Sequence, residues 1–163
     1  MTKRGQLEIS FGMIFSIIII IATIAVAFYV ISYFLNMQKC VNAGQLYQNL
    51  DNQIDTAWKG GTTKQQLVLD VPSGIEKVCF GNLTVGTVGI YSQIYDSLKE
   101  QPYLYRSTAN VFLYPPEKAC QSKMAYYKLV NSRVDKFFCR DVKKNKVNIT
   151  VEKGVYDALP KIS

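Results

Sequence analysis

The chain has 163 residues, a formal net charge of +7, four cysteines and no histidine. Without histidine, the commonest general base and the commonest metal-binding side chain are missing, and the 12 carboxylates are scattered with no distinctive pair. The composition therefore argues against an enzyme or a metal protein, and we expect no cofactor.

An uncharged, apolar stretch runs from Ile9 to Leu35. As a helix it would be roughly 40 Å long, which exceeds the roughly 30 Å hydrocarbon core of a bilayer. A cleaved secretory signal has an apolar region of only about 7 to 15 residues, and a buried helix of a soluble protein would be shorter and striped. The length favours a retained transmembrane helix over residues 6–35, since no later stretch is as apolar.

The charges that flank this stretch predict its orientation. Lys3 and Arg4 precede it, whereas only Lys39 lies close behind it. Lys and Arg near the ends of a span favour the cytoplasmic side. We expect residues 1–5 to be a cytoplasmic head and residues 36–163 to be one domain outside the plasma membrane.

The segment TKRGQLEISF, from Thr2 to Phe11, joins a basic run and a glycine to a glutamine and an acidic residue. It resembles the class III signal peptide of archaeal type IV pilin-like proteins. The resemblance implies that a prepilin-type peptidase cuts between Gly5 and Gln6. Residues 1–5 would then be a leader, and the apolar helix would serve as membrane anchor and filament core. The usual family pattern has Ser at mature position three and Glu at five, whereas Glu8 and Ser10 stand here in the exchanged order.

Glu8 has two interpretations at the lip of the apolar helix. A carboxylate there is costly unless it is paired, and the new α-amine of a neighbouring subunit is a suitable partner for assembly. Alternatively, Glu8 lies hydrated among the lipid headgroups. The partners implied by the first interpretation are membrane lipid and copies of this chain or other pilin-like subunits.

The helix is expected to continue beyond the anchor as an amphipathic segment that ends at Gly60-Gly61. Its apolar stripe is predicted to face the core: Val41, Leu46, Tyr47, Leu50, Ile54, Ala57 and Trp58.

Short strand-like runs follow, separated by glycine and proline turns. They are Gln65–Val71, Ile75–Phe80, Asn110–Tyr114, Phe137–Val142 and Lys146–Lys153. The last two are predicted to pair as a hairpin. Ile90 to Leu98 has the spacing of a short helix, and Ser122 to Val130 fits either helix or strand. The pattern predicts an α+β fold, with the long N-terminal helix packed on a mostly antiparallel sheet.

Four cysteines in an exported domain suggest two disulfides with three possible pairings, although four reduced, buried thiols remain the alternative. Cys79 and Cys139 lie in apolar, strand-like runs, which favours their pairing and leaves Cys40 with Cys120. Asn82 and Asn148 each begin an N-glycosylation sequon, which agrees with export.

Two functions of different classes remain open. The first is a pilin-like structural subunit of the cell surface, and the second is an anchored binding domain that does not polymerise. A basic bias near the C-terminus suggests either attraction to anionic lipid, envelope polymer or DNA, or only a solvated surface. It consists of Lys136, Arg140, Lys143, Lys144, Lys146 and Lys153. We expect no specific nucleic-acid partner, because the tyrosines are interleaved with aliphatic residues as in a core.

Overall fold

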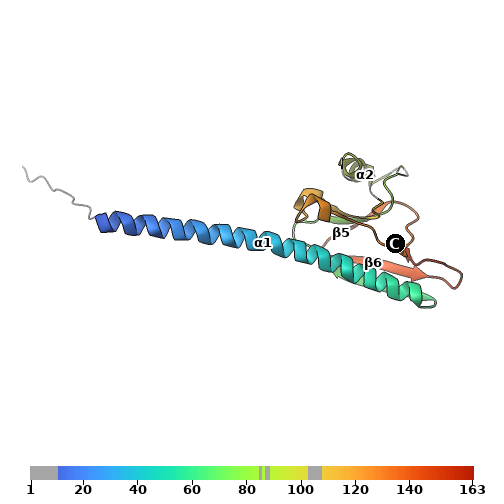
Figure 1. The fold of residues 1–163 in the computed structure, drawn as a ribbon. Helices are drawn as coiled ribbons and strands as arrows, with labels where there is room; N and C mark the ends of the chain where they lie inside the picture. Colours follow the sequence, from blue (N-terminus) through green and yellow to red (C-terminus); the bar gives the residue numbers. More distant parts are fainter. Residues whose placement is uncertain (1–10, 85, 87–88, 103–107) are drawn as a thin grey trace, which may run out of the picture. The chain divides into compact units, whose positions relative to one another are not determined.

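The computed structural model describes residues 11–84, 86, 89–102 and 108–163. Within these residues, two helices, α1 (Phe11–Lys59) and α2 (Ser92–Lys99), accompany seven strands and two short 3-10 helices, η1 (Pro116–Lys118) and η2 (Ser122–Met124). The strands are β1 (Thr63–Asp70), β2 (Lys77–Phe80), β3 (Val111–Tyr114), β4 (Tyr126–Tyr127), β5 (Phe138–Asp141), β6 (Lys146–Lys153) and β7 (Lys161–Ile162). The predicted α+β fold is confirmed, as the ribbon in Figure 1 shows.

Helix α1 belongs to two units of the chain, whose boundary lies between Asn36 and Met37. From Phe11 to Asn36 every residue of the helix is exposed. From Met37 onward the helix is part of the second unit, which contains all the sheets. The helix ends at Lys59, as the glycine pair that follows predicts.

The first sheet has the order β1-β6-β7 and is antiparallel. Residues alternate between its faces, so that Leu67 and Ile149 are opposite each other on the buried face and Val68 and Asn148 on the exposed one. The buried face packs against the second half of α1, which lies beside β6 in Figure 1. The helix contributes Ala43, Leu46, Tyr47, Leu50, Ile54 and Ala57 to this core.

Two members of the predicted apolar stripe on α1 do not join the core. Val41 remains 53 % exposed and Trp58 38 % exposed. Val41 is two residues before the buried Ala43, roughly 200° around a helix of 3.6 residues per turn, so it lies on the face of α1 that points away from the core. Trp58 lies at the edge of the buried stripe, in the last turn of the helix. The prediction that these two side chains face the core is therefore wrong.

The second sheet has the order β4-β3-β2-β5 and separates two clusters of buried side chains. Val78, Phe80 and Leu113 face the core that α1 shares. The opposite face, which carries Cys79 and Phe112, packs against Tyr95 and Leu98 of α2. Helix α2 therefore covers one face of this sheet, while the core shared with α1 lies on the other.

The predicted hairpin between the last two long strands is wrong. β5 pairs with β2, and β6 pairs with β1, so the two strands lie in different sheets. Only the turn is present: Lys143 and Lys146 form an isolated bridge, with Lys144 and Asn145 at φ of 53° and 58°. Such positive values at both central residues are typical of a type I′ turn. The turn reverses the chain, but the strands then diverge to partners that are distant in sequence.

Candidate anchor, processing and modification sites

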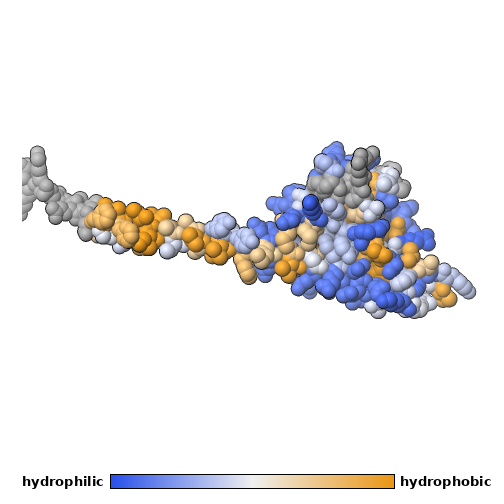
Figure 2. Space-filling model, viewed as in Figure 1, coloured by the Kyte–Doolittle hydropathy of each residue, from blue (hydrophilic) through white to orange (hydrophobic). Residues whose placement is uncertain are grey.

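The N-terminal part of α1 has the surface of a membrane anchor. It is the one helix in the described part of the chain that is long and apolar enough to cross a bilayer. In Figure 2 its surface is mostly orange, the colour of hydrophobic residues, whereas blue is widespread over the second unit. Such a surface on a helix without a protein partner is stable in lipid, because the apolar side chains leave water and the backbone N–H and C=O groups keep their hydrogen bonds within the helix.

The few polar groups of this segment are satisfied inside the helix. Ser16 Oγ donates a hydrogen bond to the carbonyl of Gly12 at 2.8 Å, and Thr23 Oγ1 donates to the carbonyl of Ile20 at 2.8 Å. Both hydroxyls therefore avoid the cost of an unpaired donor in hydrocarbon. Tyr29 and Tyr33 lie one turn apart near the second unit's side of the span, a position typical of the interfacial aromatic belt.

Gly5, Gln6 and Glu8 lie outside the described residues. Cleavage between Gly5 and Gln6, and a role of Glu8 in assembly, stay predictions from the sequence.

Both cysteine pairs favoured by the sequence are disulfides in the structure. Cys79 and Cys139 are directly opposite each other in the β2–β5 ladder, with their Cα atoms 3.9 Å apart. The second bridge joins Cys40, on α1, to Cys120, between η1 and η2, with their Cα atoms 4.9 Å apart. One bridge therefore fastens two strands, and the other fastens the helix to the segment that precedes β4.

The sequon at Asn82 is part of a tight turn. The side chain of Asn82 is exposed, and its Oδ1 accepts a hydrogen bond from the backbone N–H of Thr84 at 2.8 Å. Leu83 between them is buried, and its carbonyl accepts a hydrogen bond from the Tyr95 hydroxyl at 2.7 Å. Asn82 is thus accessible, but the residue that follows it is packed in place against α2.

The sequon at Asn148 lies in the middle of β6, on the exposed face of the first sheet. Its partner across the ladder is Val68, which is also exposed. The predicted placement of Asn148 on the polar face is therefore confirmed. Its modification stays a prediction.

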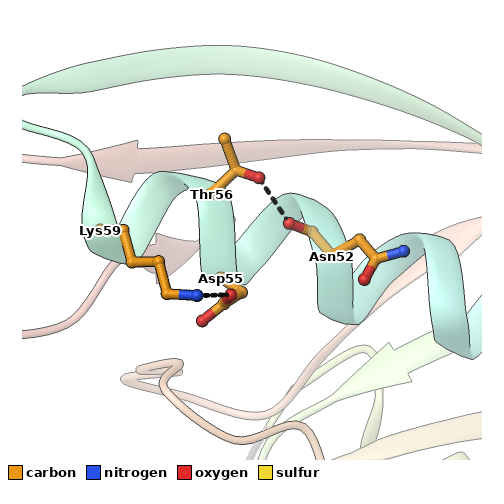
Figure 3. A network of polar contacts seen from close by, with 4 residues as sticks. All are labelled: Asn52, Asp55, Thr56 and Lys59. Atoms are coloured by element: carbon orange, nitrogen blue, oxygen red, sulfur yellow. Dashed lines mark hydrogen bonds and ion pairs between the residues drawn. The ribbon is translucent and has the colours of Figure 1, made fainter.

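A polar network marks the C-terminal end of α1 (Figure 3). Lys59 forms an ion pair with Asp55 at 2.5 Å, and Thr56 Oγ1 donates a hydrogen bond to the carbonyl of Asn52 at 2.8 Å. Lys153, at the end of β6, donates hydrogen bonds to the carbonyls of Trp58 and Gly60. A cation here pairs with carbonyls that have no partner within the helix and stabilises the negative end of the helix dipole.

Tyr47 and Tyr127 join α1 to β4 in a contact that the sequence did not reveal. Their rings are stacked with centroids 4.7 Å apart. The Tyr47 hydroxyl donates a hydrogen bond to the carbonyl of Met124 at 2.7 Å, and the Tyr127 hydroxyl donates to Asp51 at 3.3 Å. Burial raises the pKa of Tyr47, and burial together with the neighbouring Asp51 carboxylate raises the pKa of Tyr127. Both rings therefore act as neutral packing groups.

The basic residues near the C-terminus do not form one surface. Lys153 binds the end of α1, and Arg140 lies over the ring of Phe138 at 5.5 Å from its centroid. Lys143, Lys144 and Lys146 lie together around the turn between β5 and β6. In the described part of the chain, no group of three or more His, Cys, Asp or Glu side chains is arranged to hold a metal ion.

No family model, curated protein or solved structure matches the chain.

Proposed function

We propose that this protein is a pilin-like structural subunit of the cell surface, processed after Gly5 and held in the plasma membrane by its N-terminal helix before assembly. One observation carries the proposal: a single helix, α1, is fully exposed and apolar over its first half, while its second half packs into a disulfide-bonded α+β domain. An element of this kind can be stable in lipid or in a bundle of identical apolar helices.

Two further features support this assignment. The segment before the helix contains Arg4, Gly5 and Gln6 in the order that a prepilin-type peptidase cuts. Glycine at Gly5 leaves an extended backbone unobstructed by a Cβ, which suits a protease cleft just outside the membrane. Removal of the basic head would free an α-amine close to Glu8 of a neighbouring subunit.

The test begins with the mass of the intact protein isolated from its native membrane. We expect a mature chain that starts at Gln6. Gly5→Val should leave the precursor uncleaved in the membrane with its domain folded, because a β-branched side chain obstructs the cleft. Thr2→Val is the matched control, since it introduces the same side chain within the leader but away from the cut.

Assembly is tested separately from cleavage. Glu8→Gln keeps the size of the side chain but removes its charge, so we expect normal cleavage and fewer, shorter filaments by electron microscopy of sheared cell surfaces. A native protein that retains residues 1–5, or that stays a monomer after cleavage, would contradict the proposal and favour an anchored domain that binds a partner at the surface.

A further inference from the structure

The turn between β5 and β6 lies at the end of the domain where α1 enters it. Asn145 and Ser73 line one hollow together with Gln38 and Asn42, which belong to the first turns of α1 in the second unit. Lys143, Lys144 and Lys146 surround Asn145 and are exposed. The three lysines are therefore close to the residues at which the domain is tethered to the anchor.

A disulfide brings a second group of lysines to the same end of the domain. The bridge from Cys40 to Cys120 brings η1 and η2 to the start of this part of the helix. Lys118 lies against Gly74, one residue beyond Ser73, at 3.5 Å from the position of a Cβ on that glycine. Lys39 precedes Cys40 in α1, and Lys123 lines a hollow with Gly44, one turn farther along the helix.

We define the basic collar as these six lysines: Lys39, Lys118, Lys123, Lys143, Lys144 and Lys146. Four carboxylates, those of Asp70, Glu76, Glu117 and Asp141, share this end of the domain. Asp141 pairs with Lys77, so six collar lysines face three further carboxylates and an excess of positive charge is left. Lys146 pairs with Asp70 at 3.4 Å. The other five collar lysines form no ion pair within the part of the chain that the structure describes.

At the opposite end of the domain, three lysines form ion pairs. Lys59 pairs with Asp55, Lys64 with Glu152, and Lys161 with Asp135. Lysines without an ion pair also occur elsewhere, as Lys99 on α2 and Lys128 do, but five of them lie at the end that is covalently joined to the membrane helix.

We propose that the basic collar docks the domain on the anionic phospholipid headgroups of the same membrane that holds the anchor. Each lysine close to an anionic surface raises the equilibrium constant for docking roughly fivefold through electrostatic attraction. This attraction falls off within about a Debye length of the surface. The tether keeps the collar close to that surface, so that no search through solution is needed. The proposal rests on the membrane anchor of the proposed function but not on processing or polymerisation.

The experiment measures how fast each lysine of the full chain reacts with an acetylating reagent in nanodiscs that hold one copy of the protein. One set of discs contains phosphatidylcholine only, and the other contains phosphatidylcholine and phosphatidylglycerol in equal amounts. Peptide mass spectrometry then gives a rate for every lysine. We expect the six collar lysines, Lys39 and Lys146 among them, to react about fivefold more slowly in the anionic discs, and the difference to disappear in about 1 M salt. Lys59 and Lys64 are internal controls and should react equally in both.

A charge-matched pair of variants tests the role of the collar. Lys118→Gln with Lys143→Gln and Lys144→Gln should remove most of the protection of Lys39 and Lys146. Lys59→Gln with Lys64→Gln and Lys99→Gln has the same net charge but should keep it. Equal reaction rates in both kinds of disc, or protection that extends to Lys59 and Lys64, would overturn the proposal while leaving the anchor intact. Failure of the chain to copurify with the discs would overturn the anchor as well.

Discussion

At the scale of single residues, two glycines with opposite requirements show how the domain is built. Gly81 has φ of +134°, and a Cβ there would lie 2.7 Å from the Cα of Phe137. Gly44 lies inside α1, and a Cβ there would have no atom within 4 Å. Gly81 needs to be glycine because its φ is positive and because a Cβ would clash with Phe137. Gly44 has no such need, and alanine would favour the helix at that position.

These two positions form a matched pair of substitutions. We expect Gly81→Ala to lower the free energy of unfolding by about 1 to 3 kcal/mol, because it introduces both strain and a clash. Gly44→Ala should raise it by about 0.5 to 1 kcal/mol. Denaturant unfolding of the detergent-solubilised protein, followed by circular dichroism, measures both. Equal effects of the two substitutions would contradict this account of Gly81.

Tyr47 predicts how the stability of the domain depends on alkaline pH. Burial raises its pKa above the ordinary value of about 10, so the unfolded state loses this proton at a lower pH than the folded state. The stabilisation is complete below about pH 10 and is lost as the pH rises beyond it.

Tyr47→Phe therefore should weaken the fall in the free energy of unfolding between about pH 9 and about pH 11, besides removing the hydrogen bond to Met124. Tyr156→Phe is the control, because that side chain is 100 % exposed. Parallel pH profiles for the wild-type protein and Tyr47→Phe would show that Tyr47 is not the group that titrates.

At the scale of elements, the disulfides connect parts that the backbone leaves far apart. Cys79–Cys139 joins β2 to β5 across 60 residues, and Cys40–Cys120 joins α1 to the η1–η2 segment across 80 residues. Closing loops of this length restricts the unfolded chain strongly. The bridges therefore stabilise contacts between elements that are far apart in the sequence.

Replacing both cysteines of either bridge by alanine should lower the free energy of unfolding by about 4 kcal/mol. The variant that lacks Cys40 and Cys120 should in addition expose the start of the packed part of α1, around Ala43, to hydrogen exchange. Denaturant unfolding and exchange measured by mass spectrometry separate the two effects. Alkylation of any cysteine in the unreduced native protein would contradict the presence of the bridges.

At the scale of the whole molecule, the two units differ in what stabilises them. Among the residues that the structure describes, those that are buried all lie in the second unit, from Ala43 onward, and both disulfides also belong to this unit. The helical segment up to Asn36 has no protein partner and depends on lipid or on other apolar helices. The domain therefore has its own core, and we expect it to fold without the anchor.

A fragment that starts at Met37 should fold in water with both disulfides formed. We expect its thermal midpoint within about 4 °C of that of the full chain in detergent, since the fragment loses no buried contact. A fragment that starts at Gln48 is the control, because it lacks Ala43, Leu46 and Tyr47 and should not unfold cooperatively. Aggregation of the longer fragment as well would show that the domain depends on the anchor.

The sequence alone determined the features that depend on local pattern. The uncharged run up to Leu35 specified a helix suited to lipid, and Gly60-Gly61 specified its end, because hydrophobic length and backbone freedom act within a few residues. The apolar runs around Cys79 and Cys139 specified two strands whose cysteines meet.

Only the tertiary structure decided which strands are neighbours. The turn at Lys144-Asn145 reverses the chain in either topology, but β5 pairs with β2 and β6 with β1, because each buries its apolar face against a different cluster. The same long-range packing leaves Trp58 partly exposed, brings Lys153 to the end of α1, and gathers lysines from distant segments at the tethered end of the domain. Such contacts depend on which surfaces meet after the chain has folded, and no local pattern encodes them.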